Sequence, residues 1–360
     1  MATKDVAPVP TEHMPRKVTR HDWLDPPTPE IPALPVPLLN AATSIVEKKL
    51  LFVGGYSPSL GKVVNSTAEF DINTRMWSAL GVPQFPVPVS ECSMVSIGNV
   101  HYVFGGTDGE KLSGDLWSIT TQSNGDTRGT SWALLSRATS SNAEDATNGP
   151  SPRRSSSAAA GVLRGRAVLF VFGGFDGRRR KNDLWAFDVD SKAWEELYIS
   201  GNLAPSPRDG ATLVYNHVHT QLLLIGGFAS SPLADMYSLS TIGSTDTDSF
   251  EWSIYRSENP PPPRFGSFGI IAGHYLVVGL GHDARGASGA LYQMNLVDRS
   301  WTLCPTDGDD LDTRQDAAYA PSPDLKRITV IGGSTVDGRH LTSMVDIEFE
   351  KSELPTKSKK

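Results

Sequence analysis

The sequence has few cysteines, no long apolar run and no excess of positive charge. Its two cysteines, Cys92 and Cys304, are too few for a disulfide framework or a cysteine-based zinc site. No 18 consecutive residues are apolar, and the first residues lack the apolar segment of a signal peptide. We therefore expect a cytoplasmic protein that has no membrane partner.

The charge balance excludes a second class of partner. The 360 residues include 33 Lys and Arg against 40 Asp and Glu, which gives a formal net charge of −7. Nucleic acids are bound by clustered positive charge, so we expect no nucleic-acid partner. The 33 glycines and 26 prolines suit a chain with many tight turns, which favours an all-β fold.

Catalytic and metal-binding motifs are missing as well. His217 and His219 have the alternate spacing of two ligands on one side of a strand, but no third ligand is near them in the sequence. Residues 279–286, GLGHDARG, have the glycines of a phosphate-binding loop, yet a strand pattern follows where that loop requires a helix. Neither Gly-x-Ser-x-Gly nor His-Glu-x-x-His occurs. We predict no enzymatic activity, no cofactor and no metal site.

A repeat dominates what is present. An apolar run that ends in glycine occurs six times, and the first glycines of these runs are Gly54, Gly105, Gly173, Gly226, Gly279 and Gly332. The spacings between them are 51, 68, 53, 53 and 53 residues. Such a regular period predicts an architecture of repeated structural units.

Two further landmarks keep phase with these glycines. A strand of small residues precedes each glycine, and in units three to five it opens with Pro-Arg, as in PRRSSSAA (152–159). A tryptophan closes each of the first five units, at Trp77, Trp132, Trp194, Trp252 and Trp301. Each unit therefore holds four short apolar strands between turn residues, which predicts one four-stranded antiparallel blade.

The glycine pair after an apolar strand, the aromatic residue about eleven positions later and the closing tryptophan resemble the kelch repeat of β-propellers. The resemblance covers about residues 20–350 and implies an all-β, six-bladed kelch-type β-propeller. Two units depart from the pattern. The fifth has Gly279-Leu280 in place of the glycine pair, and the sixth has no closing tryptophan.

The sixth unit needs a fourth strand, because an open sheet edge is normally protected. We expect an N-terminal strand at residues 20–25, around Trp23, to complete this last blade and close the ring. The expected organisation is a disordered tail at 1–18, a propeller at 19–351 and a disordered tail at 352–360. The expected blades are about 37–81, 88–136, 152–198, 207–256, 263–305, and 313–350 plus 20–25.

The arginines are the clearest candidate site. In a four-stranded meander, the loops between the second and third strands lie on the same face as the starts of the first strands. The Pro-Arg arginines, with their equivalent in unit six, should therefore form an arc near the central channel, beside the loop 173–181. The candidate partner-binding residues are Arg153, Arg154, Arg208, Arg264, Arg314, Arg178, Arg179 and Arg180. In the alternative interpretation, the arc arginines brace loops through backbone carbonyls and the loop triplet is a solvated turn.

These observations favour a non-catalytic module for protein–protein interaction that acts as a scaffold. Because guanidinium groups pair with carboxylates in bidentate fashion, the expected partner offers an acidic segment or a free C-terminal carboxylate. The kelch resemblance implies a place in a cytoskeletal or flagellar assembly, or alternatively a substrate-recognition adaptor of a ubiquitin ligase. An adaptor needs a second surface for the ligase, and neither tail has an amphipathic helical pattern. A metal-dependent kelch enzyme is the third reading, and its motifs are missing.

Overall fold

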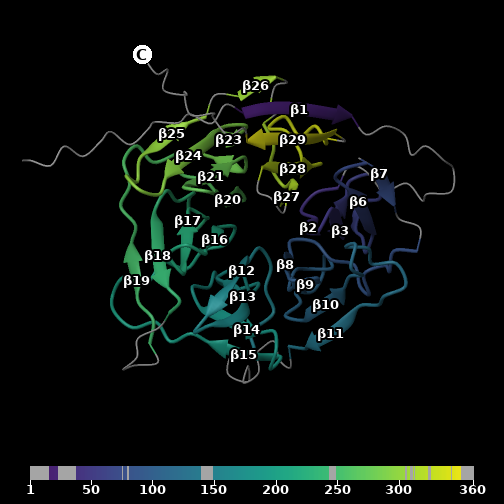
Figure 1. Cartoon of the computed structure of the whole chain (residues 1–360), viewed down its shortest axis with the longest axis horizontal. Helices are drawn as coiled ribbons and strands as arrows, with labels where there is room; N and C mark the ends of the chain where they lie inside the picture. The colour runs from purple at the N-terminus through teal and green to yellow at the C-terminus, as the bar shows by residue number, and fades with distance from the viewer. Residues whose placement is uncertain are drawn as a thin grey trace, which may run out of the picture.

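The computed structural model describes residues 16–22, 38–74, 76–78, 81–138, 149–242, 249–304, 306–308, 311, 313–322, 326–341 and 343–349. Within these ranges all regular secondary structure is β-strand, arranged in six sheets of four or five strands and two short hairpins. The sheets are the blades of a ring around a central channel (Figure 1). The expected all-β, six-bladed propeller is confirmed. No helix in the described ranges is long and apolar enough to cross a membrane.

Each blade is an antiparallel meander whose first strand lies innermost. The strands of blades 1 to 3 are β2 (Ala42–Val46), β3 (Lys49–Val53), β6 (Thr67–Asp71) and β7 (Met76–Ser78); β8 (Ser93–Ile97), β9 (Val100–Phe104), β10 (Leu116–Thr120) and β11 (Ala133–Ser136); and β12 (Ser157–Leu163), β13 (Arg166–Phe172), β14 (Leu184–Asp188) and β15 (Ala193–Glu196).

Blades 4 to 6 repeat this order, with one change in the last. Their strands are β16 (Thr212–Asn216), β17 (Gln221–Ile225), β18 (Met236–Ser240) and β19 (Trp252–Ile254); β20 (Phe268–Ala272), β21 (Tyr275–Gly279), β24 (Leu291–Asn295) and β25 (Trp301–Leu303); and β27 (Ala318–Pro321), β28 (Arg327–Ile331), β29 (Ser343–Phe349), β1 (Arg16–Asp22) and β26 (Thr306–Gly308). The two hairpins, β4 (Tyr56–Ser57) with β5 (Lys62–Val63) and β22 (His282–Asp283) with β23 (Gly286–Ala287), lie in the loops after the second strands of blades 1 and 5.

The core lies between the blades. The second strands are apolar on both faces because a neighbouring blade covers each face, and Leu222, Leu223 and Leu224 in β17 are all fully buried. The closing tryptophans pack across these seams. The Trp252 ring in blade 4 lies with its centroid 5.8 Å from that of Phe172 in blade 3, and Trp252 is only 1% exposed. Aromatic burial of this kind therefore joins successive blades.

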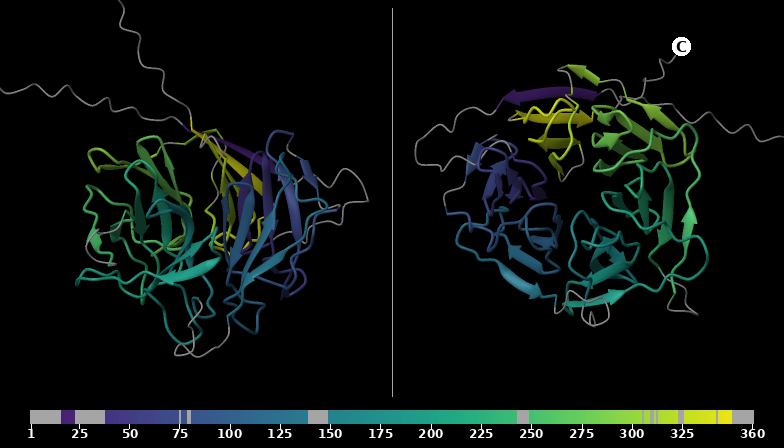
Figure 2. Two further views of the ribbon diagram at one scale, coloured as in Figure 1. Left: turned by 60° about the horizontal axis from the view of Figure 1, so that its bottom comes forward. Right: turned by 180° about the vertical axis from the view of Figure 1, so that it is seen from behind.

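The last blade contains strands from both ends of the described chain. β1 pairs antiparallel with β29, and β26 pairs in parallel with the outer edge of β1 (Figure 2). The strand spans Arg16–Asp22, whereas we expected 20–25, and Trp23 lies outside the described residues. Val18 is opposite Ile347, in the register that Trp194 has opposite Phe187 in blade 3. A buried valine thus stands where the pattern suggested a tryptophan.

The glycine pair of the fifth blade is one residue later than the sequence pattern suggests. Leu280 and Gly281 have φ of 60° and 78°, matching Gly226 and Gly227 at 58° and 100°. Gly279, which we had taken as the first glycine, is the last residue of β21. The first position of the pair is therefore a leucine in the left-handed region, which L residues with side chains rarely adopt.

This leucine stands at a position where the other seams have glycine. A Cβ added to Gly226 would lie 2.5 Å from the backbone oxygen of Arg264, so glycine allows the close approach of blades 4 and 5. Leu280 has a Cβ at that place. The next hydrogen bond, from Gly281 N to Arg314 O, is 3.2 Å long, within the range of the equivalent bonds at seams with glycine pairs, which runs from 2.7 Å (Gly55 N to Val89 O) to 3.4 Å (Gly333 N to Leu38 O). The leucine side chain is 4% exposed and packs in the core of blades 5 and 6. Burial of this apolar side chain offsets the strain of its backbone conformation.

Candidate binding site at the channel mouth

The four arginines of the expected arc are buried inside the blades. Arg153 and Arg264 are 1% exposed, and Arg208 and Arg314 are fully buried. A side chain that is buried in this way is out of reach of a protein partner. The expectation that these four residues bind a partner is therefore wrong, and the bracing interpretation describes them.

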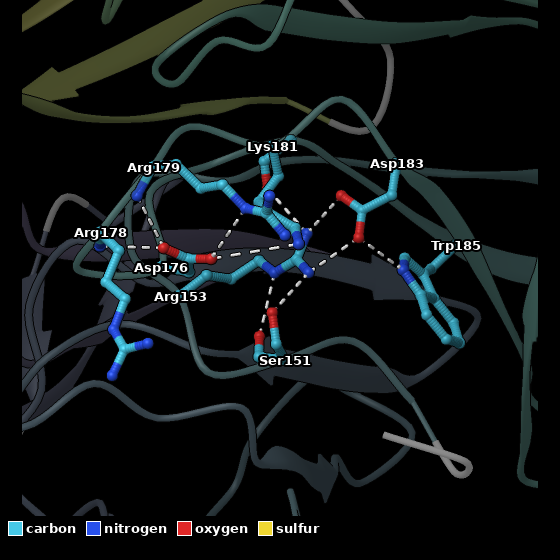
Figure 3. Close-up of polar contacts among 9 residues, drawn as sticks. Ser151, Arg153, Asp176, Arg178, Arg179, Lys181, Asp183 and Trp185 are labelled. Carbon is cyan, nitrogen blue, oxygen red and sulfur yellow. Dashed lines mark hydrogen bonds and ion pairs between the residues drawn. The ribbon is translucent and has the colours of Figure 1, made fainter. Parts of the chain in front are cut away.

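Arg153 shows how the bracing works (Figure 3). Its guanidinium donates to both carboxylate oxygens of Asp183 at 2.7 and 2.9 Å, and to the backbone oxygen of Gly173 at 3.0 Å. Two further hydrogen bonds reach the backbone and side-chain oxygens of Ser151. Burial raises the pKa of Asp183, but the hydrogen bonds and charge of Arg153 outweigh it, so that this pKa lies below its usual value. The network ties the start of blade 3 to the loop between its second and third strands.

The same arginine position also joins neighbouring blades through its backbone. The carbonyl oxygen of Arg208 accepts a hydrogen bond of 2.9 Å from Gly174 of blade 3, while its guanidinium binds Asp235 of its own blade at 2.6 and 2.8 Å. Each copy therefore fastens a seam with its main chain and a loop with its side chain.

The residue two positions after each buried arginine, or its equivalent, borders the mouth of the central channel. These residues are Asn40, Glu91, Ser155, Gly210, Gly266 and Asp316, and all six have φ between 51° and 62°. Five of them donate a backbone hydrogen bond of 2.7–3.0 Å to the carbonyl of their counterpart in the preceding blade. In the described residues, no such bond joins Asp316 N to Gly266 O. The mouth is thus framed by a nearly closed circle of main-chain bonds.

A cavity of about 520 Å³ lies at this mouth, and two of the predicted residues line it. Arg154 and Arg180 place their guanidinium carbons 5.5 and 5.9 Å from the centroid of the Phe175 ring, and Arg180 also lies 4.7 Å from the Phe228 ring. Their side chains are 40% and 31% exposed, so both remain accessible. The aromatic rings hold the guanidinium planes in place at the rim.

Carboxylates already accompany these two arginines. Nη1 of Arg154 donates to both oxygens of Glu91 at 2.6 and 2.8 Å, and Nε of Arg180 lies 3.1 Å from Asp209. Within the described residues, Nε and Nη2 of Arg154 make no hydrogen bond. Burial raises the pKa of Asp209, and Arg180 lowers it only in part, so ionised Asp209 is costly to keep at this place. The mouth therefore has both free guanidinium donors and acidic groups that compete for them.

The blade 5 side of the mouth carries aromatic rings. Phe265 stacks on the ring of His282 with centroids 4.5 Å apart and planes 8° apart, and Phe228 lies 5.0 Å from Phe265. Nε2 of His282 is 3.9 Å from a carboxylate oxygen of Asp316 in blade 6. This side offers apolar surface to a bound segment, next to the charged groups of blades 2 to 4.

The other two loop arginines lie outside the cavity. Arg178 and Arg179 are exposed, and their backbone N–H groups donate to Asp176, which shapes the turn. Figure 3 shows the guanidinium of Arg178 pointing away from the Arg153 network. Nε of Arg179 is 4.0 Å from Asp176, whereas Arg178 has no ion pair in the part of the chain that the structure describes. These two residues add positive charge around the mouth without lining it.

His217 and His219 lie at the turn after β16, on the opposite end of the blade. No group of three or more His, Cys, Asp or Glu side chains in the described ranges could hold a metal ion.

Sequence reasoning missed the acidic and aromatic members of the site. Asp209 directly follows the arginine of its Pro-Arg pair, and Glu91 lies two residues after Val89, which takes the place of that arginine in unit two. Phe175 and Phe228 each follow a glycine pair. The repeat alignment places all of these positions at the mouth, so the phase that located the arginines also contained this information.

Comparisons with known proteins support the propeller fold. A family model described as the KLHDC2/KLHL20/DRC7 Kelch-repeats domain matches residues 39–245. Human Kelch domain-containing protein 10 is 23% identical over 292 residues, covering 75% of this chain and 61% of that protein. Acyl-CoA-binding domain-containing protein 5 of Arabidopsis thaliana is 32% identical over 139 residues, covering 38% of this chain and 20% of that protein. The Dynein alpha chain, flagellar outer arm, of Chlamydomonas reinhardtii is 28% identical over 187 residues, covering 50% of this chain and 4% of that protein. The chain thus spans less than two thirds of each of these relatives.

Proposed function

The chain belongs to the kelch-repeat family of β-propellers, whose members are generally non-enzymatic protein-interaction modules, and on this basis we propose that it is a non-catalytic scaffold. Its partner contributes an acidic segment or a C-terminal carboxylate that binds at the channel mouth. Arg154 and Arg180 are the residues that receive it.

One observation carries this proposal: two guanidinium groups flank one aromatic ring at the rim of a cavity, and both are partly exposed. A carboxylate at this rim can accept hydrogen bonds from the donors of Arg154 that Glu91 leaves free. The surrounding positive charge of Arg178 and Arg179 favours the approach of an acidic segment. The stacked rings of Phe265 and His282 give the same segment an apolar surface.

The setting of the scaffold is also a proposal. The Dynein alpha chain, flagellar outer arm, is similar to 50% of this chain. This similarity supports the proposal that the protein is cytoplasmic and associated with a cytoskeletal or flagellar assembly. The adaptor alternative has no specific support from the described residues, because it depends on a second, ligase-binding surface.

The test is affinity purification of the tagged protein from native cells, with quantitative mass spectrometry. The double variant Arg154→Glu/Arg180→Glu should lose the main partner, since the change removes both donors and adds repulsion. Each charge-assisted contact contributes about 1.5–3 kcal/mol, so the loss of enrichment should exceed tenfold. Arg178→Glu/Arg179→Glu is the matched control, with the same change of charge outside the cavity, and should reduce enrichment only slightly.

Equal recovery of the partner by the wild type and by Arg154→Glu/Arg180→Glu would refute the site. Thermal unfolding of each variant confirms that the propeller is intact. The identity of the partner then decides the setting, because axonemal or cytoskeletal proteins support the scaffold and cullin subunits support the adaptor.

A further inference from the structure

Arg264 differs from its counterparts in blades 3 and 4. It is 1% exposed, yet its Nη2 has no hydrogen-bond partner. Its remaining bonds are long: Nε donates to the backbone oxygen of Pro262 at 3.2 Å and Nη1 to that of Leu280 at 3.5 Å. The ring of Tyr292 covers one face of the guanidinium, with 4.7 Å from its centroid to the guanidinium carbon.

The cause is one substitution in the repeat. Asp183 and Asp235 occupy the position before the third strand in blades 3 and 4, and each gives two carboxylate oxygens to its arginine. Ala290 stands at this position in blade 5, which its backbone bond to Leu280 N establishes, since Asp235 makes the same bond to Gly226 N. Ala290 has no side-chain oxygen to offer.

A buried guanidinium without a counter-charge is unfavourable. Arginine does not escape this cost by losing its proton, because its pKa stays far above neutrality in proteins. Burial lowers the pKa of Arg264, and Tyr292 and Asp283 offset this only in part. In blade 6, by contrast, Arg314 donates to both the backbone and the hydroxyl oxygen of Ser343. Of these four arginines, Arg264 in blade 5 is the one that has no carboxylate or hydroxyl partner at this position of the repeat.

We propose that Arg264 binds a small monovalent anion, with chloride as the physiological example, at the place where the aspartate carboxylate lies in blades 3 and 4. The anion accepts from Nη2 and compensates the buried charge. Chloride suits this place because it is compact and needs only donors. Ala290 is half-buried, so the site lies close enough to the surface for exchange with solvent. The site is separate from the channel mouth and independent of the proposed partner.

The test is urea unfolding at constant ionic strength, with sodium chloride replacing sodium gluconate, whose anion is much larger than chloride. A ligand that binds only the folded state raises the folding equilibrium constant by 1 + [L]/Kd, which is about elevenfold at ten times Kd. The wild type should therefore show a saturable rise of its unfolding midpoint with chloride. Ala290→Asp restores the carboxylate and should abolish the chloride dependence while raising the midpoint in gluconate.

Ala290→Asn is the matched control, because it has the size of aspartate without its charge. It should remove the chloride dependence without the gain in gluconate. Crystals of the wild type soaked in bromide should give an anomalous peak beside Nη2 of Arg264, and this measurement does not depend on the folding of any variant. A midpoint that is equal in chloride and gluconate, together with no bromide at Arg264, would overturn the proposal.

Discussion

Removal of the Arg153 guanidinium should destabilise the protein strongly, although arginine is usually a surface residue. Arg153 is 1% exposed and makes five hydrogen bonds, two of them to Asp183, whose side chain is 15% exposed. Breaking a buried ion pair from one side costs about 3–5 kcal/mol, because the remaining charge loses its partner. Water can reach part of Asp183, so we expect Arg153→Ala to lie near the lower end, at about 3 kcal/mol.

The assay is urea unfolding followed by far-ultraviolet circular dichroism. Arg178→Ala is the matched control: it is exposed, has no ion pair in the described residues and should change stability by less than about 0.5 kcal/mol. The pH dependence gives a second test. The folded-state pKa of Asp183 is lowered, so its contribution is present above its unfolded pKa of about 3.9 and is lost as pH falls through the folded pKa. The difference between the wild type and Arg153→Ala should shrink in that acidic window.

A loss below about 1 kcal/mol in Arg153→Ala at neutral pH would refute the bracing role. It would mean that the guanidinium is not needed to hold the loop, and the buried arginines would again require a functional explanation.

Three further predictions concern the mouth, the ring closure and one buried acid. Asp209→Asn removes the carboxylate that competes for Arg180 and should tighten binding of an acidic partner about fivefold in a titration, whereas unchanged or weaker binding would contradict that competition. Val18→Asp places a charge in the core of the last blade and should lower the midpoint of thermal unfolding by several degrees, whereas the neighbouring exposed Lys17→Asp should not; equal effects would contradict the buried register of β1. Burial raises the pKa of Glu69, whose carboxylate accepts from Thr127, so the stability that this group contributes below its unfolded pKa is lost as pH rises through the folded pKa. Glu69→Gln keeps that acceptor and should flatten the pH profile of urea unfolding above the usual glutamate pKa of about 4.3, and an unchanged profile would assign the titration to another group.

The repeat period predicted the number of blades and the strands of each one, because tight turns and buried seams recur with every copy. It misplaced the closing strand, since the search relied on a tryptophan, whereas the same register accepts the smaller Val18. It also shifted the fifth glycine pair by one residue, because Leu280 adopts a backbone conformation that is usual for glycine.

The burial of the arginines was harder to predict, since charged side chains are mostly exposed in folded proteins. The signal lay in a second column of the repeat, where an aspartate directly precedes the third strand in the units that contain Asp183 and Asp235. A cation and an anion that recur in phase indicate an internal pair. Arg154 and Arg180, which have no such partner column, are the arginines that remain at the surface of the mouth.

The pairing of β1 with β29 has a consequence for biosynthesis. The first five blades each consist of contiguous sequence, so each can form as soon as its own residues leave the ribosome. The sixth waits for residues 343–349, whereas β1, which completes it, is made before the other five blades. That strand must stay unpaired until the five other blades and residues 343–349 have been made, and the long loop that its docking closes makes this step slow. We therefore expect a nascent chain that is structured over five blades while its last blade still exposes an unpaired edge, and this interval is when the protein depends most on chaperones.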